Sequence, residues 1–339
     1  MGERNLTIPQ PSIKHRKGRG LGYHGAHMHA QLEKLLAFLS EAARTPPGDQ
    51  DFMHAAGLIE RPDFFTLEHL RAQLNSPLLM PQHFALYWQG KRVDCSPALA
   101  HKIVQGQDIP FLNKGILEDY LSRGAALVLE GLDIMCPDIN ELCAAIDAGK
   151  PNLFSNAVVF FSQQRGNEAY RGHRDTDDVL VLHLAGQKAW RLYERQAPRW
   201  VDLQELPPEK MGRLQAELVI NPGDALFIRA GTPHQVQTSG DYSMHLSCDI
   251  CDRNLNAETC AQLLLDEYKR DSASCYSPAS EVVNKLMEHA SSEKYRQKLA
   301  DLQQVHAANY ERFRALLGRN KVRALDRWIE GRSALKKAP

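Results

Sequence analysis

Residues 172–184 read GHRDTDDVLVLHL, and residues 221–234 read NPGDALFIRAGTPH. Each stretch joins a β-prone apolar run to a turn, and a histidine opens the first stretch and closes the second. In an extended chain, residues two apart point to the same side, so His173 and Asp175 can face one cavity. The turn at residues 231–233 can place His234 opposite that pair. The two stretches therefore predict a β-rich core with three metal-binding groups close together.

Two imidazoles and one carboxylate on one side of a metal leave the opposite coordination positions open, which is typical of mononuclear non-haem Fe(II) sites. A His-x-Asp pair by itself arises by chance, and the alternative is an exposed His173 with a buried, hydrogen-bonded His234. The strands and turns that flank the three residues favour the metal site. We therefore expect His173, Asp175 and His234 to bind Fe(II) and to be catalytic.

Short β-prone runs separated by Gly, Pro and Asn predict a sandwich or barrel of the jelly-roll kind, not a parallel α/β sheet. A turn at residues 185–187 is predicted to separate two of these runs. The expected fold is mainly β with α, a double-stranded β-helix with helices before and after it. The predicted strands cover residues 84–88, 127–129, 157–161, 179–184, 190–193, 217–220, 225–228 and 243–250.

Helical patterns flank the β region. Apolar residues recur at helical spacing over residues 31–44, and residues 51–78 give a mixed helical pattern. Ser277-Pro278 is suited to the start of a helix, and residues 292–317 predict a long amphipathic helix. We expect a flexible segment at residues 1–30, a catalytic domain at 31–253 and a helical region at 254–339. That last region either pairs two protomers, giving a homodimer, or folds back on one.

Composition limits the partners. Lys+Arg and Asp+Glu are both 41, so no global charge attracts nucleic acid or an anionic membrane. No apolar run approaches the ~20 residues of a membrane span, and the N-terminus lacks the apolar core of a secretory signal. Seven scattered cysteines indicate reduced thiols in a cytoplasmic protein. Cys248 and Cys251 lack a second pair at zinc-site spacing, so their proximity is interpreted as incidental, against a redox or metal role.

Lys188 is predicted to lie on a buried strand face with Trp190 and Leu192, because the three alternate along one run. A buried ammonium needs an anionic partner. A structural carboxylate would serve, and so would the carboxylate of a ligand. The neighbouring iron site favours a 2-oxo acid that chelates the metal and places its far carboxylate on Lys188.

Three stretches carry a resemblance to a known family: residues 175–194 (DTDDVLVLHLAGQKAWRLYE), 222–236 and 243–247. Together they resemble the cupin-type JmjC family of 2-oxoglutarate oxygenases, and most of all its ribosomal oxygenases, which hydroxylate protein side chains. The similarity covers roughly residues 80–253. It implies a JmjC-type jelly-roll core, Fe(II), 2-oxoglutarate as co-substrate and O2. It also implies that His173, Asp175 and His234 bind iron, and that the 2-oxoglutarate contacts are Lys188, Ser243 and Asn156.

Two departures from the family pattern leave the substrate open. Val158 stands where the family often has Tyr, and the loop at residues 162–170 is longer than usual. The resemblance implies hydroxylation of a protein or peptide side chain, with conversion of 2-oxoglutarate to succinate and CO2. A free amino acid, or a peptide intermediate of natural-product biosynthesis, is the alternative substrate. A non-catalytic metal-binding cupin scaffold is the alternative of another class, although such a scaffold has no need of a buried Lys188.

Overall fold

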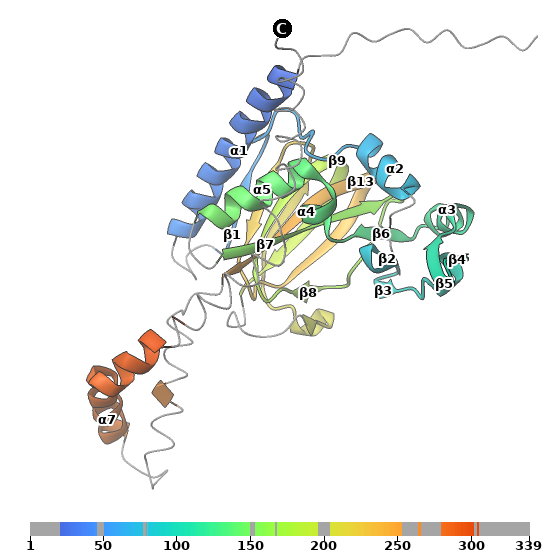
Figure 1. Cartoon of the computed structure of the whole chain (residues 1–339). Helices are drawn as coiled ribbons and strands as arrows, with labels where there is room; N and C mark the ends of the chain where they lie inside the picture. Colours follow the sequence, from blue (N-terminus) through green and yellow to red (C-terminus); the bar gives the residue numbers. More distant parts are fainter. Residues whose placement is uncertain are drawn as a thin grey trace, which may run out of the picture.

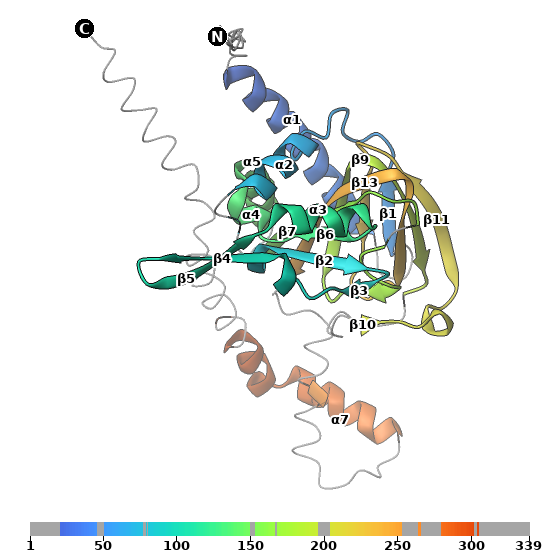
Figure 2. The same cartoon turned by 90° about the vertical axis from the view of Figure 1, so that its right-hand side faces the viewer.

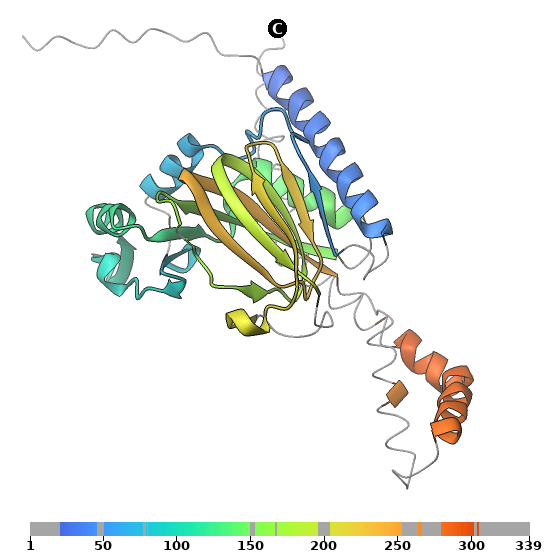
Figure 3. The same cartoon turned by 180° about the vertical axis from the view of Figure 1, so that it is seen from behind.

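The centre of the molecule is a large antiparallel sheet that curls into a jelly roll, with helices packed along one side (Figures 1 and 3). This is the fold class that the spacing of strands and turns predicted. The computed structural model describes residues 21–45, 51–76, 79, 81–149, 153–166, 168–195, 204–252, 264–265, 279–301 and 304.

The main sheet has the strand order β1-β12-β9-β13-β7-β6-β2-β3, with β11 paired to β9 and the short strands β8 and β10 attached through β13. A separate hairpin, β4–β5, projects away from it (Figure 2). The strands are β1 Phe52–Ala55, β2 Phe84–Trp88, β3 Lys91–Arg92, β4 Leu99–Val104, β5 Gln107–Leu112, β6 Ala126–Leu129, β7 Leu153–Ser162, β8 His173–Arg174, β9 Asp178–Tyr193, β10 Gln204–Glu205, β11 Leu214–Ile220, β12 Ala225–Ile228 and β13 His234–Asp252.

Helices α1, α4 and α5 lie along one face of the sheet, as Figure 1 shows. Helices α2 and α3 lie beside β2 and β6, and α7 lies apart from the sheet (Figures 1 and 3). The α-helices are α1 Leu21–Arg44, α2 Leu67–Asn75, α3 Lys114–Ser122, α4 Leu132–Met135, α5 Pro137–Ala148 and α7 Ala279–Ser291.

Strands β9 and β13 are buried on both faces, and alternate residues serve two different cores. Leu180 and Leu182 of β9 pack with Leu246 of β13 in the large core under the helices. Val179 and Val181, between them in sequence, belong to a second core inside the roll. A strand that is covered on both sides needs apolar residues at consecutive positions, which explains the run VLVLHL. The inner core is the one that surrounds the candidate site.

The predicted turn at residues 185–187 was wrong, because β9 is one continuous strand through this segment. Gly186 has φ +69°, and a Cβ atom there would lie 2.0 Å from the carbonyl oxygen of Tyr242. The missing side chain lets β9 bend against β13 without ending, and the part of β9 before Gly186 pairs with β12 whereas the part after it pairs with β11. Glycine therefore marks a bend within a strand here.

Replacing Gly186 with alanine is expected to destabilise the protein by more than replacing Gly166. Both glycines have positive φ, but a Cβ at Gly166 would meet nothing within 4 Å. Gly166→Ala should therefore cost only the conformational penalty, roughly 1–2 kcal/mol, whereas Gly186→Ala should cost about 1–3 kcal/mol more because a backbone carbonyl must move. Urea denaturation measures both, and equal losses would mean that β13 yields freely at Tyr242.

Both ends of the described region differ from expectation. Helix α1 begins at Leu21, so residues 21–30, predicted to be flexible, are helical. Adding turns to an existing helix is easier than starting one, and the buried Leu35 and Phe38 anchor this helix.

β1 was missed within residues 51–78, because its partner β12 is distant in sequence. Residues 1–20 and most of the predicted 292–317 helix lie outside the described residues. Of that predicted helix, residues 293–301 and 304 are described, and they are helical.

Cys248 and Cys251 point to opposite faces of β13. Cys248 lies in the large core, whereas the Cys251 thiol donates to Asp177 Oδ2 at 3.3 Å. They are among five free cysteines of the described part of the chain. Within the same part, no helix is long and apolar enough to cross a membrane.

Candidate metal centre

Strand pairing brings the three predicted ligands together. His173 on β8 and His234 on β13 are direct Cα partners, and their ring centroids are 4.3 Å apart. Asp175 follows β8 and places Oδ1 3.7 Å from His173 Nε2 and Oδ2 3.5 Å from His234 Nε2. One ligand atom from each residue lies within 4.8 Å of the other two. Such spacing leaves room for one ion among the three side chains.

The turn before β13 is tied to the segment that carries Asp175. The Gly231 amide donates to the Asp175 carbonyl oxygen at 2.9 Å. The Ala230 amide donates to Asp178 Oδ1, also at 2.9 Å. Because these bonds join both sides of the site through backbone groups, the approach of His234 to Asp175 is fixed by the fold itself.

Hydrogen bonds at the far side of each imidazole set its tautomer. His173 Nδ1 lies 2.8 Å from the Arg171 carbonyl oxygen, and His234 Nδ1 lies 3.0 Å from that of Thr232. Carbonyl oxygens only accept, so each Nδ1 carries the proton and each Nε2 presents a lone pair towards Asp175. Burial, aided by nearby His173, lowers the pKa of His234 to about 4, so that ring is neutral near pH 7.

Two lone pairs and a carboxylate that converge in this way repel one another unless a cation lies between them. Backbone carbonyls on the far ring nitrogens are also the usual arrangement around metal-binding histidines. The donor set of His173, Asp175 and His234 therefore fits a divalent metal with open positions, such as Fe(II).

Lys188 of β9 opens onto the same cavity of about 210 Å³ as the three ligands. Its side chain is 1% exposed, and its amine donates to His245 Nδ1 at 3.2 Å. No carboxylate of the described residues pairs with it, and burial lowers the pKa of Lys188 to about 7. A buried amine with no counter-ion beside a metal site is suited to an anionic ligand.

Ser243 and Asn156 do not line this cavity. Ser243 is buried against Thr238, with 2.8 Å between the two hydroxyl oxygens. Asn156 of β7 is the Cα partner of Asp249. Beyond Ser243 on β13, the cavity is lined by His245, Ser247 and Asp249, which share the face of Ser243 at two-residue steps. The roles of Ser243 and Asn156 as 2-oxoglutarate contacts stay predictions.

The cavity wall also has an acidic and phenolic part, of which Glu130 and Asp249 were not predicted from the sequence. Tyr170, from the loop before β8, packs its ring edge against His173 at 5.2 Å, and its hydroxyl is 3.2 Å from that of Tyr87. Glu130, after β6, and Asp249 also line the cavity. Burial, with Asp175 nearby, raises the pKa of Asp249 to about 7. The long loop was the one signal that pointed towards Tyr170.

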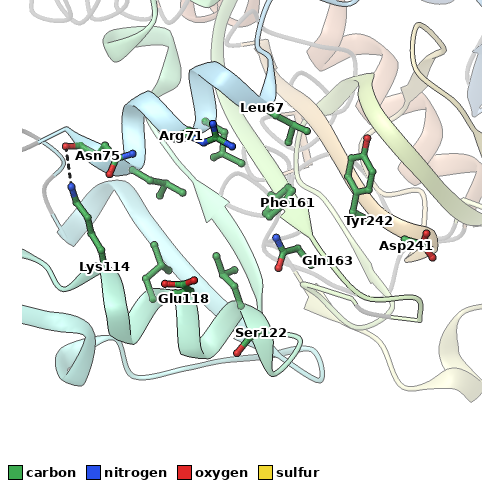
Figure 4. Close-up of a pocket in the computed structure, with 14 residues that line it drawn as sticks. Leu67, Arg71, Asn75, Lys114, Glu118, Ser122, Phe161, Gln163, Asp241 and Tyr242 are labelled. Carbon is green, nitrogen blue, oxygen red and sulfur yellow. Dashed lines mark hydrogen bonds between the residues drawn. The ribbon is translucent and has the colours of Figure 1, made fainter. Parts of the chain in front are cut away.

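A larger cavity of about 880 Å³ lies elsewhere, between α2 and α3 (Figure 4). Lys114 bridges the two helices at one end by donating to the Asn75 carbonyl oxygen at 3.5 Å. The groove has leucine walls and no histidine or cysteine among its lining residues. Volume alone therefore does not identify the site, because the converging ligands and the buried amine are in the smaller cavity. The leucines of the groove are Leu67, Leu70, Leu74, Leu117 and Leu121.

Parts of this chain are similar to one protein family and to several known proteins. Residues 140–257 match the JmjC domain family. Ribosomal oxygenase 2 of Rattus norvegicus is 31% identical over 91 residues, which cover 26% of this chain and 20% of that protein. The bifunctional lysine-specific demethylase and histidyl-hydroxylase NO66 of Aedes aegypti is 28% identical over 104 residues, covering 29% and 16%. The chain therefore spans about a fifth of the length of the curated relatives it matches. The X-ray structure of E. coli ycfD superposes with a TM-score of 0.42 at 14% identity, over 73% of this chain and 66% of that one.

Proposed function

We propose that this chain, whose JmjC domain is of the ribosomal-oxygenase-like branch, is an Fe(II)- and 2-oxoglutarate-dependent oxygenase that hydroxylates a side chain of a protein or peptide. The observation that carries the proposal is the buried amine of Lys188, which has no carboxylate partner among the described residues and lies in the same cavity as His173, Asp175 and His234. The reaction would convert a C–H bond, O2 and 2-oxoglutarate into an alcohol, succinate and CO2.

In this proposal, His173, Asp175 and His234 hold the iron from one side. When bound, the iron and 2-oxoglutarate supply the oxidising power. Lys188 binds the carboxylate of the co-substrate that lies farthest from the metal. Trp190, stacked on His234 with centroids 5.8 Å apart, forms an apolar wall that excludes water. Its buried Nε1–H has no partner among the described residues and is available to an acceptor on a ligand.

A non-catalytic scaffold would need the metal ligands but not Lys188. A charged amine without a counter-ion is destabilising when buried, so a protein that binds no anion gains nothing from it. A hydrophobic residue at position 188 would pack as well against Phe160, whose ring centroid lies 5.7 Å from the amine. The presence of lysine at this position therefore favours the oxygenase.

The test is Fe(II)-dependent formation of succinate from 2-oxoglutarate by the purified chain, with and without cell extract. We expect succinate in both cases and more of it with extract. Mass spectrometry of proteins, peptides and free amino acids from cells with and without the gene should then reveal one added oxygen atom on a protein or peptide. Tight iron binding with no turnover under any condition would instead support the scaffold.

A further inference from the structure

Lys188 has one hydrogen-bond partner among the described residues, His245. The amine donates to His245 Nδ1 over 3.2 Å. An ammonium group has no acceptor, so Nδ1 accepts and Nε2 carries the ring proton. The imidazole is 4% exposed, and burial together with the nearby Lys188 and His183 lowers its pKa well below the usual value. His245 is therefore a neutral acceptor for the only buried amine of the cavity wall.

The strand register fixes the imidazole of His245 in place. On β13, this residue is the Cα partner of Phe160 on β7 and of His183 on β9. Its ring stacks on that of Phe160, with centroids 4.8 Å apart and planes 3° from parallel. Trp190 packs against the same ring edge-on at 5.7 Å. Because aromatic rings bound the imidazole on two sides, it has little freedom to turn away from Lys188.

We propose that His245 is a positioning residue of the co-substrate site: it directs the amine of Lys188 into the metal cavity without cancelling the charge that a ligand carboxylate needs. The inference rests on the proposed function, because it assigns a second residue to the 2-oxoglutarate site. A carboxylate at position 245 would pair with the amine and compete with the ligand. A neutral imidazole takes one of the three N–H groups and leaves two for the ligand.

This role predicts an order among variants at position 245. Asparagine offers an amide oxygen that can accept from the amine, so His245→Asn should keep most of the affinity. Leucine offers no acceptor, and the amine loses both its orientation and part of its compensation for burial. Aspartate accepts well but brings its own negative charge, so His245→Asp should bind a dicarboxylate no better than His245→Leu. A role in packing alone would favour leucine over the two polar residues.

The experiment is calorimetric titration of the full chain with glutarate, which has both carboxylates of 2-oxoglutarate but no keto group to chelate a metal. We expect His245→Leu and His245→Asp to bind it about tenfold to a hundredfold more weakly than the unmodified chain. His245→Asn should stay within about threefold, a change of less than 1 kcal/mol. In turnover assays the KM for 2-oxoglutarate should rise in His245→Leu with kcat and iron binding little changed.

Met244→Leu is the matched control, because Met244 is adjacent on β13 but lies in the large core. Thermal unfolding of every variant checks that the fold is kept. Unchanged glutarate affinity in His245→Leu would overturn the role of His245 while leaving the oxygenase intact. So would an asparagine variant as weak as the leucine one. If the unmodified chain binds neither glutarate nor 2-oxoglutarate, the proposed function fails and the inference fails with it.

Discussion

Replacing Asp175 with alanine is expected to abolish 2-oxoglutarate turnover, with a loss of about a thousandfold or more, because a bound metal contributes several kcal/mol to such reactions. Asp175 supplies the one negative charge among the three ligands, and each of its oxygens faces one histidine Nε2. Without it, only the two imidazoles remain, and they bind Fe(II) weakly. Metal content after dialysis and succinate yield measure the two effects, which should fall together.

Asp177→Ala is the control for that substitution. Asp177 lies two residues further along and accepts from Cys251, but it does not line the metal cavity. Asp177→Ala therefore removes the same charge from the same loop without removing a ligand. We expect its metal content and turnover to stay near those of the unmodified chain. Equal losses in both variants would mean that the loop charge as a whole matters, and an Asp175→Ala protein that keeps its metal would contradict the ligand assignment.

Local patterns predicted the elements whose ends are set by nearby residues. Strand β12 has the predicted bounds, because the turn at residues 221–223 precedes it and all four of its residues are apolar and buried. β1 was missed because a four-residue, half-buried strand exists only through pairing with β12, about 170 residues away in sequence. The bend at Gly186 has the same origin, since it depends on the approach of Tyr242. Contacts between distant segments are what the local pattern does not encode.

The residues of the candidate site also fall into those that local patterns predict and those that depend on contacts between distant segments. His173, Asp175 and His234 could be predicted because the ligand spacing is local or lies beside recognisable turns. Ser243 was predicted to contact 2-oxoglutarate, and the β13 residues that line the cavity lie before it (His234 and Val236) and after it (His245, Ser247 and Asp249). The register of β13 against β9 shifts between Thr238 and Ser243 and again after Met244, so its depth could not be counted from sequence. Alternation along a strand predicts which face of the sheet a side chain is on, whereas its position relative to the cavity depends on how the strand pairs with its neighbours.

Lys188→Met is expected to weaken co-substrate binding strongly while leaving the ligand-free protein as stable as before, or more stable. Replacing a buried charge that has no counter-ion by an apolar side chain of similar length typically leaves stability unchanged or raises it by about 1–4 kcal/mol. The KM for 2-oxoglutarate should rise about thirtyfold or more, because the ligand carboxylate loses its cation. Lys102→Met, on the exposed β4, should change neither quantity. A Lys188→Met protein that is clearly destabilised would identify Lys188 as a structural residue.

The pH dependence of the unmodified protein and of Lys188→Met separates the effect of the amine's charge from that of the side chain's shape. Burial lowers the pKa of Lys188 from 10.5 to about 7, so the folded protein binds fewer protons than the unfolded chain between these values. Stability should therefore rise with pH across that window, and the gain from Lys188→Met should be largest below it. Affinity for 2-oxoglutarate should run the opposite way, because the carboxylate selects the charged amine. It should be level below about pH 7 and fall by up to about tenfold per pH unit above it. Opposite slopes for stability and affinity are the result expected of an anion-binding amine, because an amine that does not contact the ligand would leave the affinity level across this window.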